Sequence, residues 1–191
     1  MSSTTTRDRI LDALSDILIS QGSSAVTLES VAAAADVSKG GLLYHFPSKQ
    51  AMIAGLVQRL SEEAEREFAA AEQAEEGLVR AYLEGSLPSS PREVALYWSL
   101  IASLRSQELA SPDLMHHVHE VFSRWARMLH AAIPDPVLAE NIRLVGDGLY
   151  LTAISGLPMP DETVVRQLMD RLVHQAEQAQ EANPKPGPDQ A

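Results

Sequence analysis

Between residues 27 and 46 the sequence predicts two short helices separated by a tight break. Thr27 can cap a segment that runs to residue 35, and the alanines in this segment suit close packing between helices. Asp36 and Val37 then form the break, and Ser38 can cap a second short helix that runs through Tyr44. Two helices this short and this close together make a helix-turn-helix.

Helical periodicity extends over almost all of the remaining chain. A first helix is predicted over residues 7–21, with Gly22 as a left-handed C-cap, by the spacing of Ile10, Leu11, Leu14, Ile17 and Leu18. Apolar spacing and capping signals predict further helices over residues 49–67, 76–86, 91–108, 112–132, 136–156 and 161–181. The sequence shows no strand alternation longer than a few residues and no internal repeat.

The expected architecture is therefore all-α. A three-helix helix-turn-helix domain over residues 4–64 carries the motif at residues 27–46, and an antiparallel helical domain follows over residues 65–181. Residues 182–191 are rich in proline and polar side chains, so we expect a disordered tail.

The charge of the chain is divided unevenly along its length. A net charge of -11 argues by itself against nucleic-acid binding, because a phosphate-binding surface should be basic. Residues 1–60, however, hold five basic and five acidic side chains, whereas the rest of the chain holds 10 basic and 21 acidic ones. The first segment can therefore approach DNA, with the acidic remainder pointing away from the phosphates.

Several classes of protein are disfavoured by what the sequence lacks. No stretch approaches the roughly 18 to 20 apolar residues that span a bilayer, and the first residues lack the apolar core of a signal peptide, so we expect a soluble cytoplasmic protein. With no cysteine, the chain has no disulfide, thiolate metal site or cysteine nucleophile. No nucleophile elbow, zinc-protease motif, P-loop or dinucleotide fingerprint is present, so we expect neither an enzyme nor a bound cofactor.

The stretch TLESVAAAADVSKGGLLYHFPSK, residues 27–49, resembles the DNA-binding signature of TetR-type (TetR/AcrR) transcriptional regulators. The resemblance covers about residues 4–64 closely and the rest in general layout. It implies a sequence-specific regulator, by family default a ligand-released repressor, which binds a palindromic operator on double-stranded DNA as a homodimer. The alternative is a helical dimeric interaction protein that has lost its DNA contacts, and the presence of Lys39, Gly40, Tyr44 and Lys49 counts against it.

A helix that enters the major groove needs small residues for close approach and a few long side chains that reach bases or phosphates. Gly40 and Gly41 meet the first need, the alternative being a flexible turn. Lys39 could reach a guanine edge and Leu42 a thymine methyl group, whereas Leu43 and Phe46 are expected to face inward.

Four further residues are candidates for phosphate contacts: Thr27, Tyr44, His45 and Lys49. Thr27 and Lys49 stand at helix N-termini, and the resemblance implies that they clamp the DNA backbone on either side of the groove. An ordinary N-cap is the alternative role for Thr27, and a solvated surface lysine is the alternative for Lys49.

The resemblance also implies that the last two long helices pair with their copies in a four-helix dimer interface, and the alternative is that they only cover the monomer core. It places a pocket for a small-molecule effector among the preceding helices. Candidate lining residues are Trp98, Arg105, His116, His119, Phe122, Trp125, Asp147 and Tyr150, although such a stripe can equally be core. The acidic excess suits an apolar effector that is neutral or cationic.

Two features of this region have competing interpretations. His116, His119 and Glu120 share one helical face, but three ligands from a single turn without support elsewhere make a poor metal site, so we expect none. Asp147 lies between two glycines in an apolar helix, and a pairing with Arg105 or Arg143 is favoured over direct effector contact.

Overall fold

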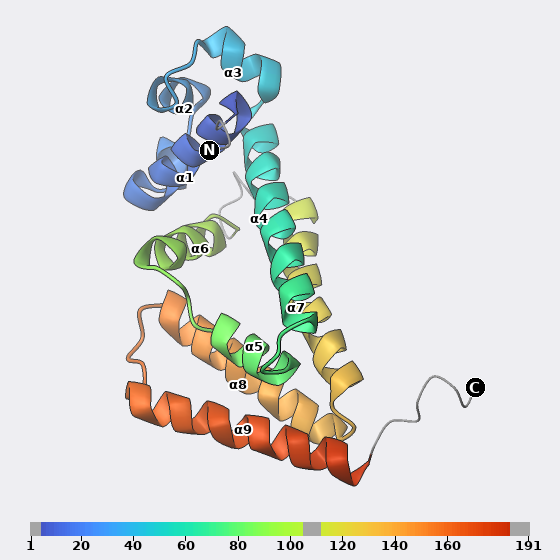
Figure 1. Ribbon diagram of the computed structural model, residues 1–191. Helices are drawn as coiled ribbons and strands as arrows, with labels where there is room; N and C mark the ends of the chain where they lie inside the picture. The colour runs from blue at the N-terminus through green and yellow to red at the C-terminus, as the bar shows by residue number, and fades with distance from the viewer. Residues whose placement is uncertain (1–4, 105–111, 184–191) are drawn as a thin grey trace, which may run out of the picture. The chain divides into compact units, whose positions relative to one another are not determined.

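The computed structural model describes residues 5–104 and 112–183, and their side chains apart from 101–104, 112–114, 117 and 118. Within these ranges all regular elements are helices (Figure 1), which confirms the all-α expectation. They are α1 (Thr6–Gln21), the 3₁₀ turn η1 (Ser23–Ala25), α2 (Leu28–Ala34), α3 (Lys39–His45), α4 (Lys49–Glu72), α5 (Leu78–Gly85), α6 (Pro91–Leu104), α7 (Pro112–Ala132), α8 (Pro136–Ile154) and α9 (Glu162–Ala182). The expected extension of α6 to residue 108 and most of the expected tail lie outside the described residues.

Local capping explains where several of these helices begin. The Thr27 hydroxyl accepts a hydrogen bond from the Ser30 amide at 3.0 Å, and the Thr27 amide in turn donates to the Ser30 hydroxyl, so Thr27 is the N-cap that the sequence predicted. Ser38 caps α3 and Asp135 caps α8 by accepting backbone amide hydrogen bonds, without the return bond. Asp36 takes a φ of 52° in the break between α2 and α3.

Gly22 ends α1, but not as the left-handed cap that was predicted. Its φ is 78° and its ψ is 178°, so its backbone is extended at positive φ, a conformation that glycine adopts without strain. This geometry leads directly into η1, a turn that the sequence spacing did not predict.

The described chain forms two compact units. The first contains the described residues up to Ala64 and those of 90–119, and the second contains residues 65–89 and 120–183. Helix α6 belongs to the first unit, because it packs on α1 and buries Leu100 in the core formed by α1–α4. The sequence had placed this helix with the domain that follows.

Each unit has its own apolar core. The first core is built from α1 residues such as Leu11 and Leu14, together with Leu42 of α3 and Met52 of α4. The second core joins α5, α7, α8 and α9. No helix within the described ranges is both long and apolar enough to cross a membrane.

Candidate DNA-binding surface and the C-terminal side-chain network

Helix α3 has one buried side and one exposed side. Leu42 is 0% exposed and Phe46 is also buried, one helical turn apart, and both join the core of the first unit. Lys39, Gly40 and Tyr44 are exposed, as expected for the face that would meet a DNA groove. The hydroxyl of Ser38 accepts a hydrogen bond from the Gly41 amide at 3.0 Å and fixes the first turn of the helix.

The assignment of Leu42 to a thymine contact is wrong, because this side chain is in the protein core. Leu43, which was expected to face inward, is instead 37% exposed. The cause is the phase of the helix: Leu42 and Phe46 are four residues apart and occupy the inward side together. An apolar contact to a base can therefore come from Leu43 and not from Leu42.

The two glycines of α3 differ in their surroundings. A Cβ atom added at Gly41 would lie 3.2 Å from the Ser38 hydroxyl oxygen, so the capping geometry favours a glycine there. A Cβ atom at Gly40 would meet nothing within 4 Å. Packing within the protein therefore does not explain Gly40.

Two lysines expected on this surface have partners within the protein. The Lys39 ammonium lies 2.6 Å from a carboxylate oxygen of Glu29, which is in the first turn of α2. The Lys49 ammonium donates a hydrogen bond to the Ser23 carbonyl at 3.0 Å and thereby ties the first residue of α4 to η1. An ammonium group has three donors, so both lysines keep capacity for a further acceptor.

Three aromatic side chains at the end of α3 make contacts with other side chains. The Tyr44 and His45 rings meet edge to face, with centroids 5.2 Å apart. The guanidinium group of Arg7 lies 5.5 Å from the centroid of the Phe46 ring. Sequence reasoning did not single out Arg7 or Glu29, and neither stands in a pattern that would have revealed its contact.

Helix α1 forms ion pairs with two other helices of the first unit. Asp12 accepts from Arg59 of α4 at 2.7 Å, and Asp16 accepts from Arg92 of α6 at 2.5 Å. The Arg92 pair lies on the same contact of α1 with α6 that buries Leu100.

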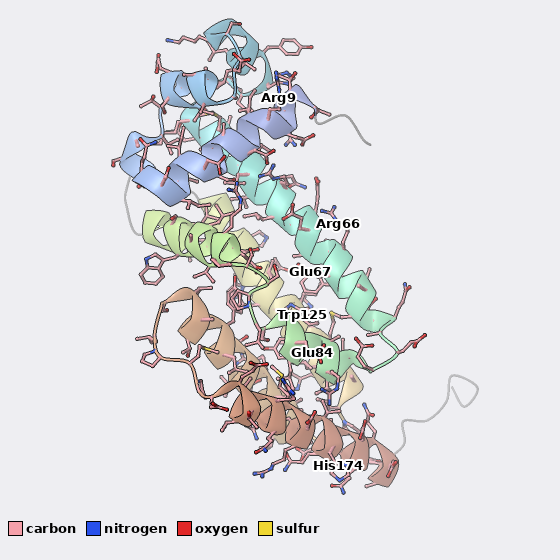
Figure 2. All side chains as sticks on the ribbon, turned by 60° about the vertical axis from the view of Figure 1, so that its left-hand side comes forward. Arg9, Arg66, Glu67, Glu84, Trp125 and His174 are labelled. Carbon is pink, nitrogen blue, oxygen red and sulfur yellow. The ribbon has the colours of Figure 1, made fainter. Side chains whose placement is uncertain are left out.

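In the second unit, three aromatic rings form a continuous cluster. Trp125 of α7, labelled in Figure 2, meets Phe68 with centroids 5.0 Å apart and Tyr82 with centroids 5.1 Å apart. The guanidinium group of Arg124 lies 5.0 Å from the centroid of the Phe68 ring, and it also pairs with Glu65 at 2.7 Å. The rings therefore already interact with one cation of the chain itself.

A polar network continues from this cluster along α8. The Tyr82 hydroxyl group donates to Asp147 at 3.0 Å and lies 2.8 Å from the Arg143 carbonyl oxygen, while the Arg143 guanidinium pairs with Asp147. The expected pairing of Asp147 with Arg143 is thus confirmed. Burial is the main cause that raises the pKa of Tyr82 above its ordinary value. Gly146 makes room for this ring, because an added Cβ atom would lie 2.5 Å from Tyr82 Cε1.

The network ends at Glu140, which is the acceptor for two neighbours. Arg143 donates to it at 3.0 Å through Nε, and the His130 ring nitrogen lies 3.3 Å from it. These hydrogen bonds, that from Arg143 first, lower the pKa of Glu140 to about 2.

The predicted effector-binding residues are distributed over both units. Trp98 on α6 and His116 and His119 on α7 are exposed and belong to the first unit by their contacts. Phe122, Trp125, Asp147 and Tyr150 are half-buried in the second unit, whereas Arg105 lies outside the described residues. Of these residues, Trp125 and Asp147 meet through Tyr82. Over the described ranges, no three His, Asp or Glu side chains come together as a metal site would require.

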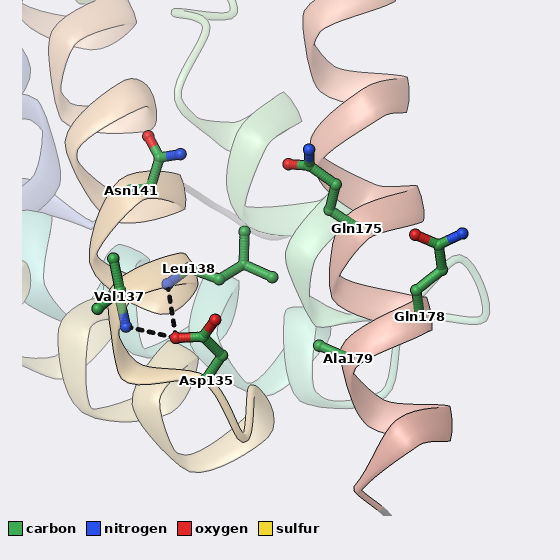
Figure 3. A pocket seen from close by; sticks show the side chains of 7 residues that line it. All are labelled: Asp135, Val137, Leu138, Asn141, Gln175, Gln178 and Ala179. Carbon is green, nitrogen blue, oxygen red and sulfur yellow. Dashed lines mark hydrogen bonds between the residues drawn. The ribbon is translucent and has the colours of Figure 1, made fainter.

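An open hollow of about 430 Å³ lies between α8 and α9 (Figure 3). It is lined by Asp135, Val137, Leu138, Asn141, Gln175, Gln178 and Ala179, so none of the predicted effector-binding residues contributes to it. Next to it, α8 exposes three large apolar side chains at intervals of seven residues, which we call the α8 stripe: Val137 (77% exposed), Leu144 (57%) and Leu151 (47%).

Comparisons with known proteins agree with this geometry. Residues 10–56 match the family described as bacterial regulatory proteins of the tetR family, and residues 76–177 match a tetracyclin repressor-like C-terminal domain. The chain is 34% identical over 166 residues to the HTH-type transcriptional regulator AlkX of Mycobacterium tuberculosis, which covers 82% of this chain and 76% of that protein.

Solved structures share the fold over most of the chain. The multidrug binding protein EbrR in complex with malachite green is 26% identical, covers 87% of this chain and 96% of its own, and has a TM-score of 0.66. GusR of Salmonella enterica, at 19% identity, covers 93% of this chain and 98% of its own, with a TM-score of 0.67.

Proposed function

The chain belongs to the TetR family and is a DNA-binding transcriptional regulator, and from this premise we propose that it is a ligand-released repressor which binds a palindromic operator as a homodimer. In this proposal residues 4–64 bind DNA, and residues 65–181 bind the effector and form the dimer. The observation that carries it is the exposed face of α3, where Lys39, Gly40 and Tyr44 stand on a helix anchored by Leu42 and Phe46.

The residues proposed to contact DNA fall into two groups, those that read bases and those that bind phosphates. Lys39 is the proposed base reader, with Gly40 and Gly41 allowing close approach to the groove. The proposed phosphate contacts are Thr27, Tyr44, His45 and Lys49. Lys49 supports this division best, because it starts a long helix and its ammonium group is held at a fixed place by the Ser23 carbonyl.

Fluorescence anisotropy with DNA from upstream of the chain's own gene, over a range of salt concentrations, tests this proposal. Lys49→Ala should weaken binding to all sequences about equally and flatten the salt dependence, whereas Lys39→Ala should change the preference between sequences. Arg127→Ala removes an exposed cation of the second unit and is the control. The proposal fails if the wild-type chain shows no saturable, sequence-preferring binding, and the contact assignment fails if both lysine variants bind like the wild type.

The homodimer is proposed to form through the α8 stripe. Leucine and valine side chains exposed at intervals of seven residues along one helix suit packing against another helix. A two-fold dimer would then present its two copies of α3 to half-sites about 34 Å apart or a multiple of that distance.

Sedimentation velocity tests the dimer. Leu144→Glu places a charge in the middle of the α8 stripe and should give a monomer that loses operator affinity. Met115→Glu alters an apolar residue of α7 that is 51% exposed and should stay dimeric. A dimer that persists in Leu144→Glu would contradict this interface.

The effector is proposed to be an aromatic, apolar molecule that is neutral or cationic, and to bind near Trp125 and Asp147. Three observations support this. The Phe68 ring, which contacts Trp125, already binds the Arg124 guanidinium over its face, and the Asp147 carboxylate already pairs with Arg143. The chain beyond residue 60 also carries the whole acidic excess. The EbrR structure, which is complexed with malachite green, adds a similar protein with a cationic aromatic ligand.

Tryptophan fluorescence can test the site, because Trp98→Phe leaves Trp125 as the single tryptophan. Malachite green should quench Trp125 saturably and release operator DNA at the same concentrations. Asp147→Asn should weaken both effects, while Glu181→Gln, an exposed carboxylate of α9, should not. Quenching that is absent, or that is unaffected by Asp147→Asn, would contradict the proposed class or the proposed site.

A further inference from the structure

The ion pair between Lys39 and Glu29 joins two different helices on the proposed DNA-binding surface. The Nζ–Oε1 distance is 2.6 Å, and the side chains are 58% and 66% exposed. The pair thus puts a carboxylate beside the proposed base reader, on the surface where phosphates would repel it.

The ion pair itself adds little to stability. Exposed ion pairs contribute little to the free energy of folding, with a median near zero to about 1 kcal/mol. An exposed glutamate is ionised at neutral pH, and the hydrogen bond from Lys39 lowers the pKa of Glu29 further, so its negative charge would cost DNA affinity. The first turn of α2 favours a negative charge at Glu29, and a contact with a base would further offset the cost to DNA affinity.

We propose that Glu29 and Lys39 act together as the reader of one G·C base pair in the major groove. This inference rests on the placement of α3 in the groove that is proposed above. The two free donors of Lys39 would bond to N7 and O6 of the guanine, and a carboxylate oxygen of Glu29 would accept from N4 of the paired cytosine.

The order of donors and acceptors on the edge of a base pair makes the Glu29–Lys39 ion pair selective. A G·C pair presents two neighbouring acceptors and then a donor, whereas an A·T pair presents an acceptor, a donor and an acceptor. Two donors of Lys39 can therefore bond to neighbouring acceptors only on guanine. The Glu29 carboxylate then lies next to its donor, the N4 amino group of cytosine. A lone lysine would also bind phosphates, and Glu29 suppresses this by neutralising it.

Binding to a library of operators randomised at each position, for the wild type and Glu29→Gln, tests the proposal. Glu29→Gln frees the charge of Lys39, so affinity for non-specific DNA should rise and the salt slope should steepen by about one phosphate contact. At one operator position per half-site the preference for G·C should fall by about fivefold or more, the low end of what one good base contact provides. Lys39→Met should abolish the preference at the same position.

Asp36→Asn is the matched control, because it removes another exposed carboxylate of the helix-turn-helix and asparagine tolerates the positive φ at this position. It should shift overall affinity without changing the preference at any position. If the wild-type protein shows no sequence preference, the proposed operator binding is refuted. That result is distinct from a failure of the Glu29–Lys39 proposal. If the wild type is selective and Glu29→Gln keeps the same preferences, or if Asp36→Asn changes them equally, the paired reader is refuted.

Discussion

Replacing Gly40 by alanine adds one methyl group to the exposed side of α3 and should change folding and DNA binding in opposite directions. The added Cβ atom meets nothing within 4 Å in the free protein. Alanine is favoured over glycine inside a helix by roughly 0.5–1 kcal/mol, so Gly40→Ala should unfold at a higher temperature than the wild type. For a chain of this size the melting temperature should rise by about 1–4 °C.

On DNA the same methyl group should be harmful, because α3 approaches the groove where Gly40 lies. Forcing an extra methyl group into a packed contact costs roughly 1–3 kcal/mol, which corresponds to about a 5- to 150-fold loss of operator affinity. Scanning calorimetry measures the first effect and fluorescence anisotropy at fixed salt the second.

Gly85→Ala on α5 is the control for Gly40→Ala, since its added Cβ atom also meets nothing within 4 Å. It should leave operator affinity unchanged. If Gly40→Ala raises stability and binds the operator as tightly as the wild type, Gly40 does not serve close approach to DNA, and the reasoning about this face of α3 is refuted.

Further predictions concern the network on α8. Gly146→Ala should destabilise the protein in urea unfolding by up to about 2 kcal/mol, because overpacking against the hydrogen-bonded Tyr82 ring exceeds the gain in helix propensity. A variant more stable than the wild type would show that the ring moves freely. Burial raises the pKa of Tyr82, so its contribution to stability is complete below the unfolded value near 10 and is lost as the pH rises above it. Alkaline unfolding should therefore have a weaker pH dependence in Tyr82→Phe, and an unchanged dependence would contradict this. The pKa of Glu140 is lowered to about 2, so its contribution is present above the unfolded value of 4.5 and is lost as the pH falls from there to about 2. Acid unfolding of Glu140→Gln should be less steep in that window, and equal steepness would speak against the ion pair.

The positions of the helices could be predicted because their causes are local. Thr27, Ser38 and Asp135 cap the helix that directly follows them, and each of those helices begins as the sequence predicted. The pairing of Arg143 with Asp147 was predictable for the same reason, since residues four apart are neighbours on a helix.

Contacts between residues far apart in the sequence could not be read in this way. Tyr82 reaches Asp147 across 65 positions, and no pattern in the sequence links the tyrosine to the glycine that makes room for it. The inward and outward roles of Leu42 and Leu43 were predicted the wrong way round for another reason. Two adjacent leucines fit either phase of a short helix, and only packing against α1 and α4 decides which of them is buried.

The burial of Leu100 and the ion pair between Arg92 and Asp16 have a consequence for modularity. A fragment that stops at residue 64 would lose both and leave a vacant site in its core, although it contains the whole helix-turn-helix. Chimeric regulators made by exchanging DNA-binding segments at that boundary should therefore be less stable than chimeras that also transfer residues 90–104 from the same parent. The first compact unit is thus discontinuous in the sequence, and a boundary at residue 64 cuts through it.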